Sequence, residues 1–162
     1  MREMDRMADQ MQRAFERNAW HGPALMETLA GLTATDAHSR PVASAHTIWE
    51  MVQHLSSWKE IVARRLAGER IDDVATDVDW PAITDSSESG WAATLQHLSD
   101  AQQKLMGAVK VFDPMRLMCS VPGTNYTYYV MIHGVPQHDV YHAGQISLLK
   151  RTMAEKETPV SN

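Results

Sequence analysis

Hydrophobic residues recur along most of the chain at intervals of three and four positions, the spacing of one face of an α-helix. No stretch alternates hydrophobic and polar residues with the period of two that a half-buried strand would show. The pattern therefore predicts an all-α fold with four long helices. We expect these helices over residues 3–19, Ala45–Ala67 and Glu88–Val111, and from about Tyr126–Tyr129 to Ala154.

Glycine, proline and capping residues mark the expected ends of these helices. Gly22-Pro23 interrupts the first pattern, so the chain forms either one helix kinked at Pro23 or two pieces with Pro23 in the first turn of the second. Ser44 is the expected N-cap of the second long helix and Gly68 its stop. At Gly134-Val135-Pro136 the last helix is either continuous or broken or kinked, and the sequence leaves this open.

The connection Glu69–Ser87 is long for a linker inside a compact domain. Its length is explained if it crosses the whole bundle, which would set the second and third long helices parallel to each other. The fold class that we predict is a four-helix bundle with one long crossover. A chain of this length is expected to form a single domain, over residues 1–154, followed by a polar tail at 155–162.

Composition excludes several classes of partner. The net charge of −5 and the absence of a lysine and arginine run argue against a nucleic-acid binder and against a membrane surface. No segment has the roughly 20 apolar residues of a membrane span. The single cysteine, Cys119, cannot form an intrachain disulfide, which fits a reducing cytoplasm.

Histidines supply the candidate chemistry. His138 and His142 are four residues apart in the last predicted helix, so their rings lie on one face, about 6 Å apart along the axis. That face also carries apolar residues, and buried imidazoles need partners for their nitrogens. His54 points from the second long helix into the same core, and alone it would be read as an ordinary core histidine. Together the three histidines predict a metal site, with open coordination positions that are typical of a working site.

The remaining candidates receive other roles. Gln145 could contact a ligand, orient an imidazole or simply pack between helices. Asp139 and Tyr141 flank the metal face and could support it, and we expect Asp139 and Glu50 toward the edges of their inward faces. Positions at helix ends, outer faces or loops are expected to lie outside the ligand set: His21, His38, His46, His97, His133 and Cys119.

The spacing of His138 and His142 also matches the H-E-x-x-H helix of zinc proteases. Asp139 stands in the place of the glutamate but is one methylene shorter, and no further ligand follows at the usual distance. The third inward imidazole lies upstream, on another helix. The protease interpretation is therefore disfavoured.

Three segments together resemble the DinB/YfiT-like superfamily. They are the last-helix stretch from Gly134 to Ile146, the segment Ala19-Trp20-His21-Gly22-Pro23-Ala24-Leu25, and the segment from His46 to Leu55 followed by Trp58-Lys59. The resemblance implies a four-helix bundle with a crossover and a divalent metal ion bound by His54, His138 and His142. Zn or Ni is the expected ion, with Fe or Mn as alternatives. Members are often homodimers, and the family name does not imply DNA binding.

The resemblance leaves the reaction open. Some relatives transfer low-molecular-weight thiols such as bacillithiol or mycothiol to electrophiles, and others have been described as metal-dependent hydrolases. We expect a thiol-dependent transferase acting on a small molecule, with the thiol as a second cofactor, because hydrolysis usually needs a carboxylate base near the metal. The alternatives are a metal-dependent hydrolase and a non-catalytic module that binds a metal or a small molecule.

Overall fold

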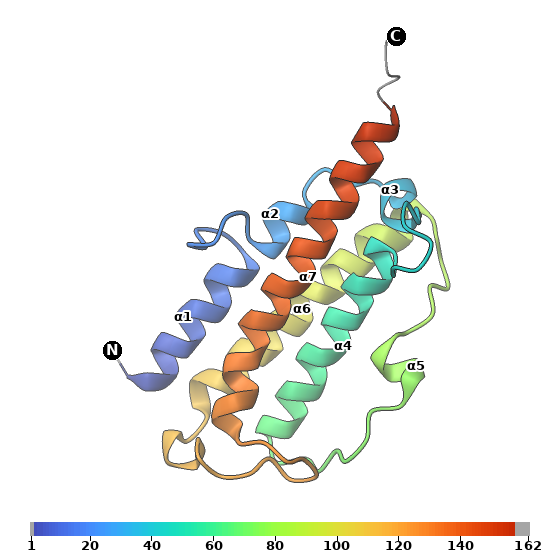
Figure 1. Cartoon of the computed structure of the whole chain (residues 1–162). Helices are drawn as coiled ribbons and strands as arrows, with labels where there is room; N and C mark the ends of the chain where they lie inside the picture. The colour runs from blue at the N-terminus through green and yellow to red at the C-terminus, as the bar shows by residue number, and fades with distance from the viewer. Residues whose placement is uncertain (1, 158–162) are drawn as a thin grey trace.

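Four long helices form the bundle: α1 (Glu3–Phe15), α4 (Ile48–Leu66), α6 (Glu88–Val111) and α7 (Tyr128–Glu157). The structure is a computed structural model and describes residues 2–157. As Figure 1 shows, α1 and α7 run in one direction, and α4 and α6 run in the other. The two parallel helices α4 and α6 pack directly on each other, so the chain between them returns along the length of the bundle. This confirms the predicted all-α bundle with its crossover.

Short helices occupy the connections. They are α2 (Leu25–Leu29) and α3 (Ala34–His38) between α1 and α4, α5 (Thr76–Asp79) on the crossover, and the 3₁₀ turn η1 (Pro114–Arg116) before α7. Gly22-Pro23 does divide the first region into two pieces, but Pro23 precedes the N-cap Ala24 and is not in the first turn of α2. The first helix also ends earlier than expected, and the positive φ of Asn18 lies in the turn that follows.

Helix α4 begins three residues later than predicted, because its N-cap is Thr47 and not Ser44. The Thr47 hydroxyl accepts a hydrogen bond from the Glu50 N–H (3.1 Å), and the Glu50 carboxylate accepts one from the Thr47 N–H (2.7 Å). This reciprocal capping box satisfies two backbone donors that Ser44 could not reach. Gly68 follows the end of the helix with φ +94°, as expected for a residue that stops a helix in the left-handed conformation.

Helix α7 is continuous through Pro136, a point that the sequence leaves open. It extends to Glu157, past the expected end at Ala154, while residues 158–162 of the expected tail lie outside the described residues. The third long helix has the predicted bounds. As a result, His138 and His142 belong to one uninterrupted helix, and their relative positions are set by regular helical geometry.

The apolar core consists of two clusters, one toward each end of the bundle. One contains Val62 of α4 together with Met131 and Val135 of α7. The other contains residues before His54 on α4 and after His142 on α7, such as Val52 and Ile146. Between them lies a layer of buried or half-buried polar and aromatic side chains, which we call the polar layer: His54, Trp58, Lys59, His138, Asp139 and His142.

Candidate metal centre

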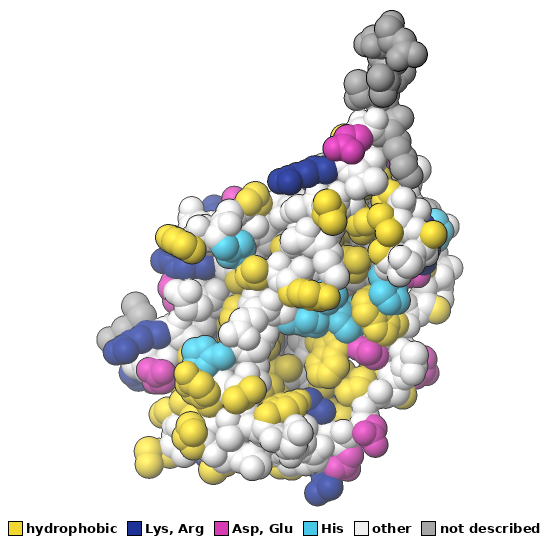
Figure 2. All heavy atoms as spheres, viewed as in Figure 1, with side chains coloured by type: hydrophobic (Ala, Val, Ile, Leu, Met, Phe, Trp, Pro, Cys, Tyr) yellow, Lys and Arg dark blue, Asp and Glu magenta, His cyan; other side chains and the backbone are white. Residues whose placement is uncertain are grey.

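The three predicted histidines converge in the polar layer. Nε2 of His138 lies 3.0 Å from Nε2 of His54 and 3.0 Å from Nε2 of His142. One ligand nitrogen from each of the three residues falls within 4.8 Å of the others. His54 and His142 are buried and His138 is half-buried. Figure 2 shows histidine side chains gathered near the middle of one face of the molecule, bordered by hydrophobic side chains and a hollow.

Each histidine is held in its neutral form. Burial, followed by the neighbouring histidines and Lys59, lowers the pKa of His138 to about 3. Burial also lowers the pKa of His142 to about 4, although Gln145 acts in the opposite direction. The pKa of His54 is lowered by burial as well, against the opposing effect of Asp79. At neutral pH the site therefore presents unprotonated imidazole nitrogens, the form that binds metal ions.

The hydrogen bonds of the cluster fit a shared ion better than a set of histidine–histidine bonds. Nδ1 of His54 donates to the backbone carbonyl of Asp79 (2.9 Å), so its Nε2 carries a lone pair. That lone pair faces Nε2 of His138, which also faces Nε2 of His142. Nitrogens that bind one ion through bonds of about 2.0–2.1 Å lie about 3 Å apart, and the two pairs that include Nε2 of His138 have this separation. The residues present therefore fit a divalent metal ion.

The crossover supplies the outer support of His54. The Asp79 carboxylate lies 3.0 Å from Nδ1 of His54 and accepts a hydrogen bond from the Trp58 indole N–H (2.6 Å). Trp80 stacks on the His54 ring with centroids 4.0 Å apart, and His46 stacks on the other face of Trp80 at 3.5 Å. These contacts fix the orientation and the tautomer of His54, as supporting residues do in metal sites.

A buried ion pair lies beside the histidines. The Lys59 ammonium donates to both oxygens of Asp139 at 2.6 and 2.7 Å, and the two side chains are only 2% and 1% exposed. Burial raises the pKa of Asp139, whereas Lys59 opposes this effect. The expectation that Asp139 lies toward an edge was wrong. Asp139 packs against Lys59 of α4, and the ring centroid of Phe15 on α1 lies 5.0 Å from the Lys59 ammonium, so the direction next to the metal face is also covered.

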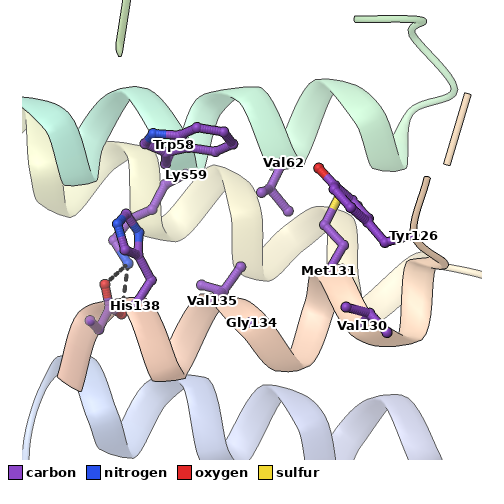
Figure 3. Close-up of a pocket in the computed structure, with 10 residues that line it drawn as sticks. Trp58, Lys59, Val62, Tyr126, Val130, Met131, Gly134, Val135 and His138 are labelled. Carbon is purple, nitrogen blue, oxygen red and sulfur yellow. Dashed lines mark hydrogen bonds and ion pairs between the residues drawn. The ribbon is translucent and has the colours of Figure 1, made fainter. Parts of the chain in front are cut away.

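Two cavities adjoin the histidines. The first, of about 310 Å³, lies between α4 and α7 and includes His138, Lys59 and Asp139 in its wall. Figure 3 shows its apolar side chains pointing toward one another from the two helices. The second, of about 540 Å³, is lined by all three histidines and by His46 and Gln145, among others. The site is therefore open to ligands from two sides.

The other sequence candidates do not join the cluster. Gln145 lines the second cavity, and its side-chain oxygen lacks a hydrogen-bond partner, as does Nδ1 of His142. Tyr141 is exposed, with its ring centroid 5.0 Å from that of His142. The candidates that were expected outside the ligand set lie outside the convergent group: His21, His38, His46, His97, His133 and Cys119.

The sequence pattern does not indicate that Asp79 and Trp80 contact His54, because the crossover lacks the hydrophobic period of the long helices. A signal was available in the tryptophan, since a large aromatic residue in an acidic linker usually needs a surface on which to pack. In the sequence, Lys59 belongs to one of the three segments that carry the family resemblance. Nothing in its own sequence position indicated that it would be buried against Asp139.

An all-helical bundle with a crossover and three convergent histidines defines a class of helical proteins whose site is compatible with a divalent metal ion. Comparison with known protein families matches residues 17–146 to the DinB superfamily. The match covers most of the chain and includes all three histidines, so the chain belongs to the DinB superfamily. Comparisons with curated proteins and with solved structures found no match. Within the described residues, no helix is both long and apolar enough to span a membrane.

Proposed function

We propose that this protein is a divalent-metal-dependent enzyme that transfers a low-molecular-weight thiol to a small electrophilic substrate, with His54, His138 and His142 as the metal ligands. The observation that carries the proposal is the convergence of three neutral imidazoles between two cavities. Three histidine ligands leave coordination positions free for exogenous ligands. Zn or Ni is the ion that we expect.

A bound divalent ion would supply Lewis acidity, which lowers the pKa of a thiol or a water molecule that binds beside it. The residues of the chain would position the reactants. Asp79 and Trp80 hold His54 in place, and the two cavities offer separate approaches to the ligand set. In the transfer itself, a sulfur–carbon bond forms, the bond from that carbon to its leaving group breaks, and the thiol proton passes to solvent.

The carboxylates near the site favour thiol transfer over hydrolysis. A hydrolase generally needs a general base within hydrogen-bonding reach of the attacking water. Among the described residues, Asp139 is the one carboxylate that lines either cavity, and it lines the first. Both of its oxygens accept hydrogen bonds from Lys59. Asp79 is engaged with His54 and Trp58. A thiolate needs no such base once it has formed.

The first experiment tests the ligand set. We expect His54→Ala, His138→Ala and His142→Ala each to lose most of the bound metal, measured by elemental mass spectrometry of protein purified without added metal. His97→Ala is the matched control, because His97 is exposed and contacts Glu60 on the surface. This control should retain the metal content of the unaltered protein. Unchanged metal in all three ligand variants would remove the site.

The second measurement tests the reaction. Protein loaded with Zn or Ni should consume thiol in the presence of an electrophile such as iodoacetamide, and the three ligand variants should not exceed the uncatalysed rate. A full metal complement without thiol consumption, across bacillithiol, mycothiol and glutathione, would contradict the transferase proposal. Ester or amide hydrolysis by the same sample would favour the hydrolase. Neither activity, with a large loss of melting temperature in the ligand variants, would favour a non-catalytic module.

We also propose that the protein is a homodimer. Several apolar side chains of α7 are exposed, among them Tyr129, Val130, Tyr141 and Leu148. Trp20, in the connection between α1 and α2, is fully exposed and lies near Tyr141. Exposed apolar side chains that lie together, as Trp20 and Tyr141 do in the wall of one surface hollow, often mark a site of protein association. The molar mass from sedimentation equilibrium tests this proposal, and a mass of one chain at micromolar concentration would contradict it.

A further inference from the structure

The cavity between α4 and α7 has apolar walls that end at the metal centre. Val62 extends into it from α4, and Met131 and Val135 extend into it from α7 (Figure 3). Trp58 and His138 lie together at one end of this cavity (Figure 3). His138 is also one of the three convergent histidines, and its Nε2 lies 3.0 Å from Nε2 of His54. A molecule that fills this cavity therefore contacts the wall that carries a proposed metal ligand.

The polar groups in the cavity wall are already satisfied by partners in the chain. The Lys59 ammonium and the Asp139 carboxylate neutralise each other through two short hydrogen bonds. The Tyr126 hydroxyl accepts a hydrogen bond from the guanidinium of the buried Arg65 (2.5 Å). A charged occupant would lose its hydration without gaining an opposite charge, so the cavity favours an uncharged one.

The volume of the cavity limits the size of that occupant. An apolar cavity of about 150 Å³ holds one benzene molecule. The cavity here has a volume of about 310 Å³, which is near the lower end of the range for ligand pockets. It therefore accommodates an aromatic ring with a short alkyl chain, or two fused rings.

The second cavity has a different character. Ser44, His46 and Gln145 contribute polar groups to its wall, and it adjoins the three histidines from the side of Trp80. A polar thiol with hydroxyl, amide or carboxylate groups would find hydrogen-bonding partners there and none in the apolar cavity. The two cavities thus differ in the chemistry that they accept.

We infer that the apolar cavity bounded by Val62, Met131, Val135 and Trp58 is the binding site for the uncharged aryl or alkyl group of the electrophilic substrate. This inference rests on the proposed function, because it places the two reactants in two cavities that share His138 in their walls. It names the substrate class as small, neutral, apolar electrophiles. Burial of the apolar group supplies the binding free energy, and the wall at His138 sets how deeply the group enters.

Binding of phenylpropanol to the whole, metal-loaded protein tests the site directly. We expect saturable binding that shifts the NMR signal of the Met131 methyl group, whereas propanediol, which lacks the ring, should not shift it. Val135→Phe places a larger side chain in the space that the ring would occupy and should weaken phenylpropanol binding by about tenfold or more. Val111→Phe is the matched control, because Val111 is 85% exposed at the end of α6 and lines no part of this cavity.

A second variant covers the case in which Val135→Phe does not fold. Val135→Ala enlarges the cavity and should shift the preference toward the longer phenylbutanol. Equal affinities of the unaltered protein, Val135→Phe and Val135→Ala for these alcohols would overturn the inference. So would shifts confined to residues of the second cavity.

The outcome can be separated from that of the proposed function. Alcohol binding is measured without a thiol and without turnover, so it can succeed even when thiol consumption is absent. If the transferase activity is present, Val135→Phe should raise the KM for benzyl chloride by about tenfold, the same factor as for the alcohol. The KM for iodoacetamide, which has no apolar group to place, should stay within about twofold, and equal increases for both electrophiles would contradict the assignment.

Discussion

The most unusual residue of the polar layer is Lys59, whose ammonium is buried against Asp139 and whose charge also lies 5.0 Å from the centre of the Phe15 ring. A buried ion pair offsets a large loss of hydration only when its geometry is good, and here both carboxylate oxygens are used. The Lys59–Asp139 pair lies next to His138 in the wall of the first cavity, and its two opposite charges sum to zero. Its removal should therefore affect stability more directly than chemistry.

We predict that Lys59→Met lowers the free energy of unfolding by about 3–5 kcal/mol, because Asp139 is left as an uncompensated buried carboxylate. Burial raises the pKa of Asp139, so without Lys59 the carboxyl should fold in its protonated form. A group whose pKa is higher in the folded state contributes stability that is lost as the pH rises. The deficit of Lys59→Met relative to the unaltered protein should thus be smaller at pH 5 than at pH 8 in guanidinium denaturation.

The control is the double variant Lys59→Met with Asp139→Leu, which replaces both charges with apolar groups of similar size. It should recover most of the lost stability at every pH. A double variant that is as unstable as the single one would show that the pair is needed for more than mutual neutralisation.

The positions of individual residues could be predicted from the sequence where they depend only on the 3.6-residue period of one helix. His138 and His142 share a face because they are four residues apart in one helix, and His54 could be placed by its spacing within α4. Asp139 could not be placed in the same way. Asp139 is buried against Lys59 of α4, whose ammonium also lies beside Phe15 of α1, and a helical period does not say where neighbouring helices pack.

At the scale of elements, the short helix α5 matters more than its four residues suggest. It ends with Asp79 and is followed by Trp80, and both residues contact His54. An acidic, exposed connection is thereby anchored to the metal centre at one point. The capping box between Thr47 and Glu50 fixes the start of α4, and Thr47 lies seven residues before His54.

We predict that Asp79→Ala lowers the affinity for Zn by about 10–100-fold, the usual effect of losing a partner that orients a histidine ligand. The loss should not be complete, because the backbone carbonyl of Asp79 still accepts from His54. Competition with a chromophoric zinc chelator gives the affinity. Asp77→Ala is the control from the same helix, where Asp77 is exposed, and its affinity should be unchanged.

An equal affinity of both variants would mean that α5 does not support the ligand set. The sequence could not reveal this role, because the hydrophobic period that defines the long helices is absent from the crossover. The length of the connection predicted its path across the bundle, but not the point at which it touches the site. The sequence also left the continuity of α7 open, because a proline inside a helix is only weakly distinguished from one that ends it.

At the scale of the whole molecule, a layer of polar groups separates two apolar clusters. The clusters supply the stability of the bundle, and the polar layer supplies the site. The overall fold was predictable because four amphipathic patterns and one long connection leave few arrangements. The division of the core into two clusters was not, because it depends on which side chains meet across helices.

We predict that the metal-free protein loses stability as the pH falls from about 6.5 toward 4. Burial lowers the pKa of His138 to about 3 and that of His142 to about 4 in the folded protein. In the unfolded chain both histidines have a pKa of about 6.5. In this range the unfolded chain binds more protons than the folded one, so acid favours unfolding. Guanidinium denaturation with a chelator at several pH values measures the slope.

His138→Gln should show a shallower slope under these conditions, and His97→Ala should keep the slope of the unaltered protein. Zn at about 100 times its Kd should add about 2.7 kcal/mol at pH 7. A metal-free protein whose stability is flat between pH 6.5 and 4 would contradict the neutral, buried state of the histidines.

The three imidazoles come from distant parts of the chain, since 84 residues separate His54 from His138. Bringing such remote points together costs roughly 4 kcal/mol of chain entropy, so a loose polypeptide offers an ion only the nearby pair on α7. The folded bundle presents all three imidazoles at once, so a divalent ion should bind the folded protein more tightly than the unfolded chain. Bound metal would then act as a cross-link between α4 and α7, and its removal should loosen the packing of these two helices first.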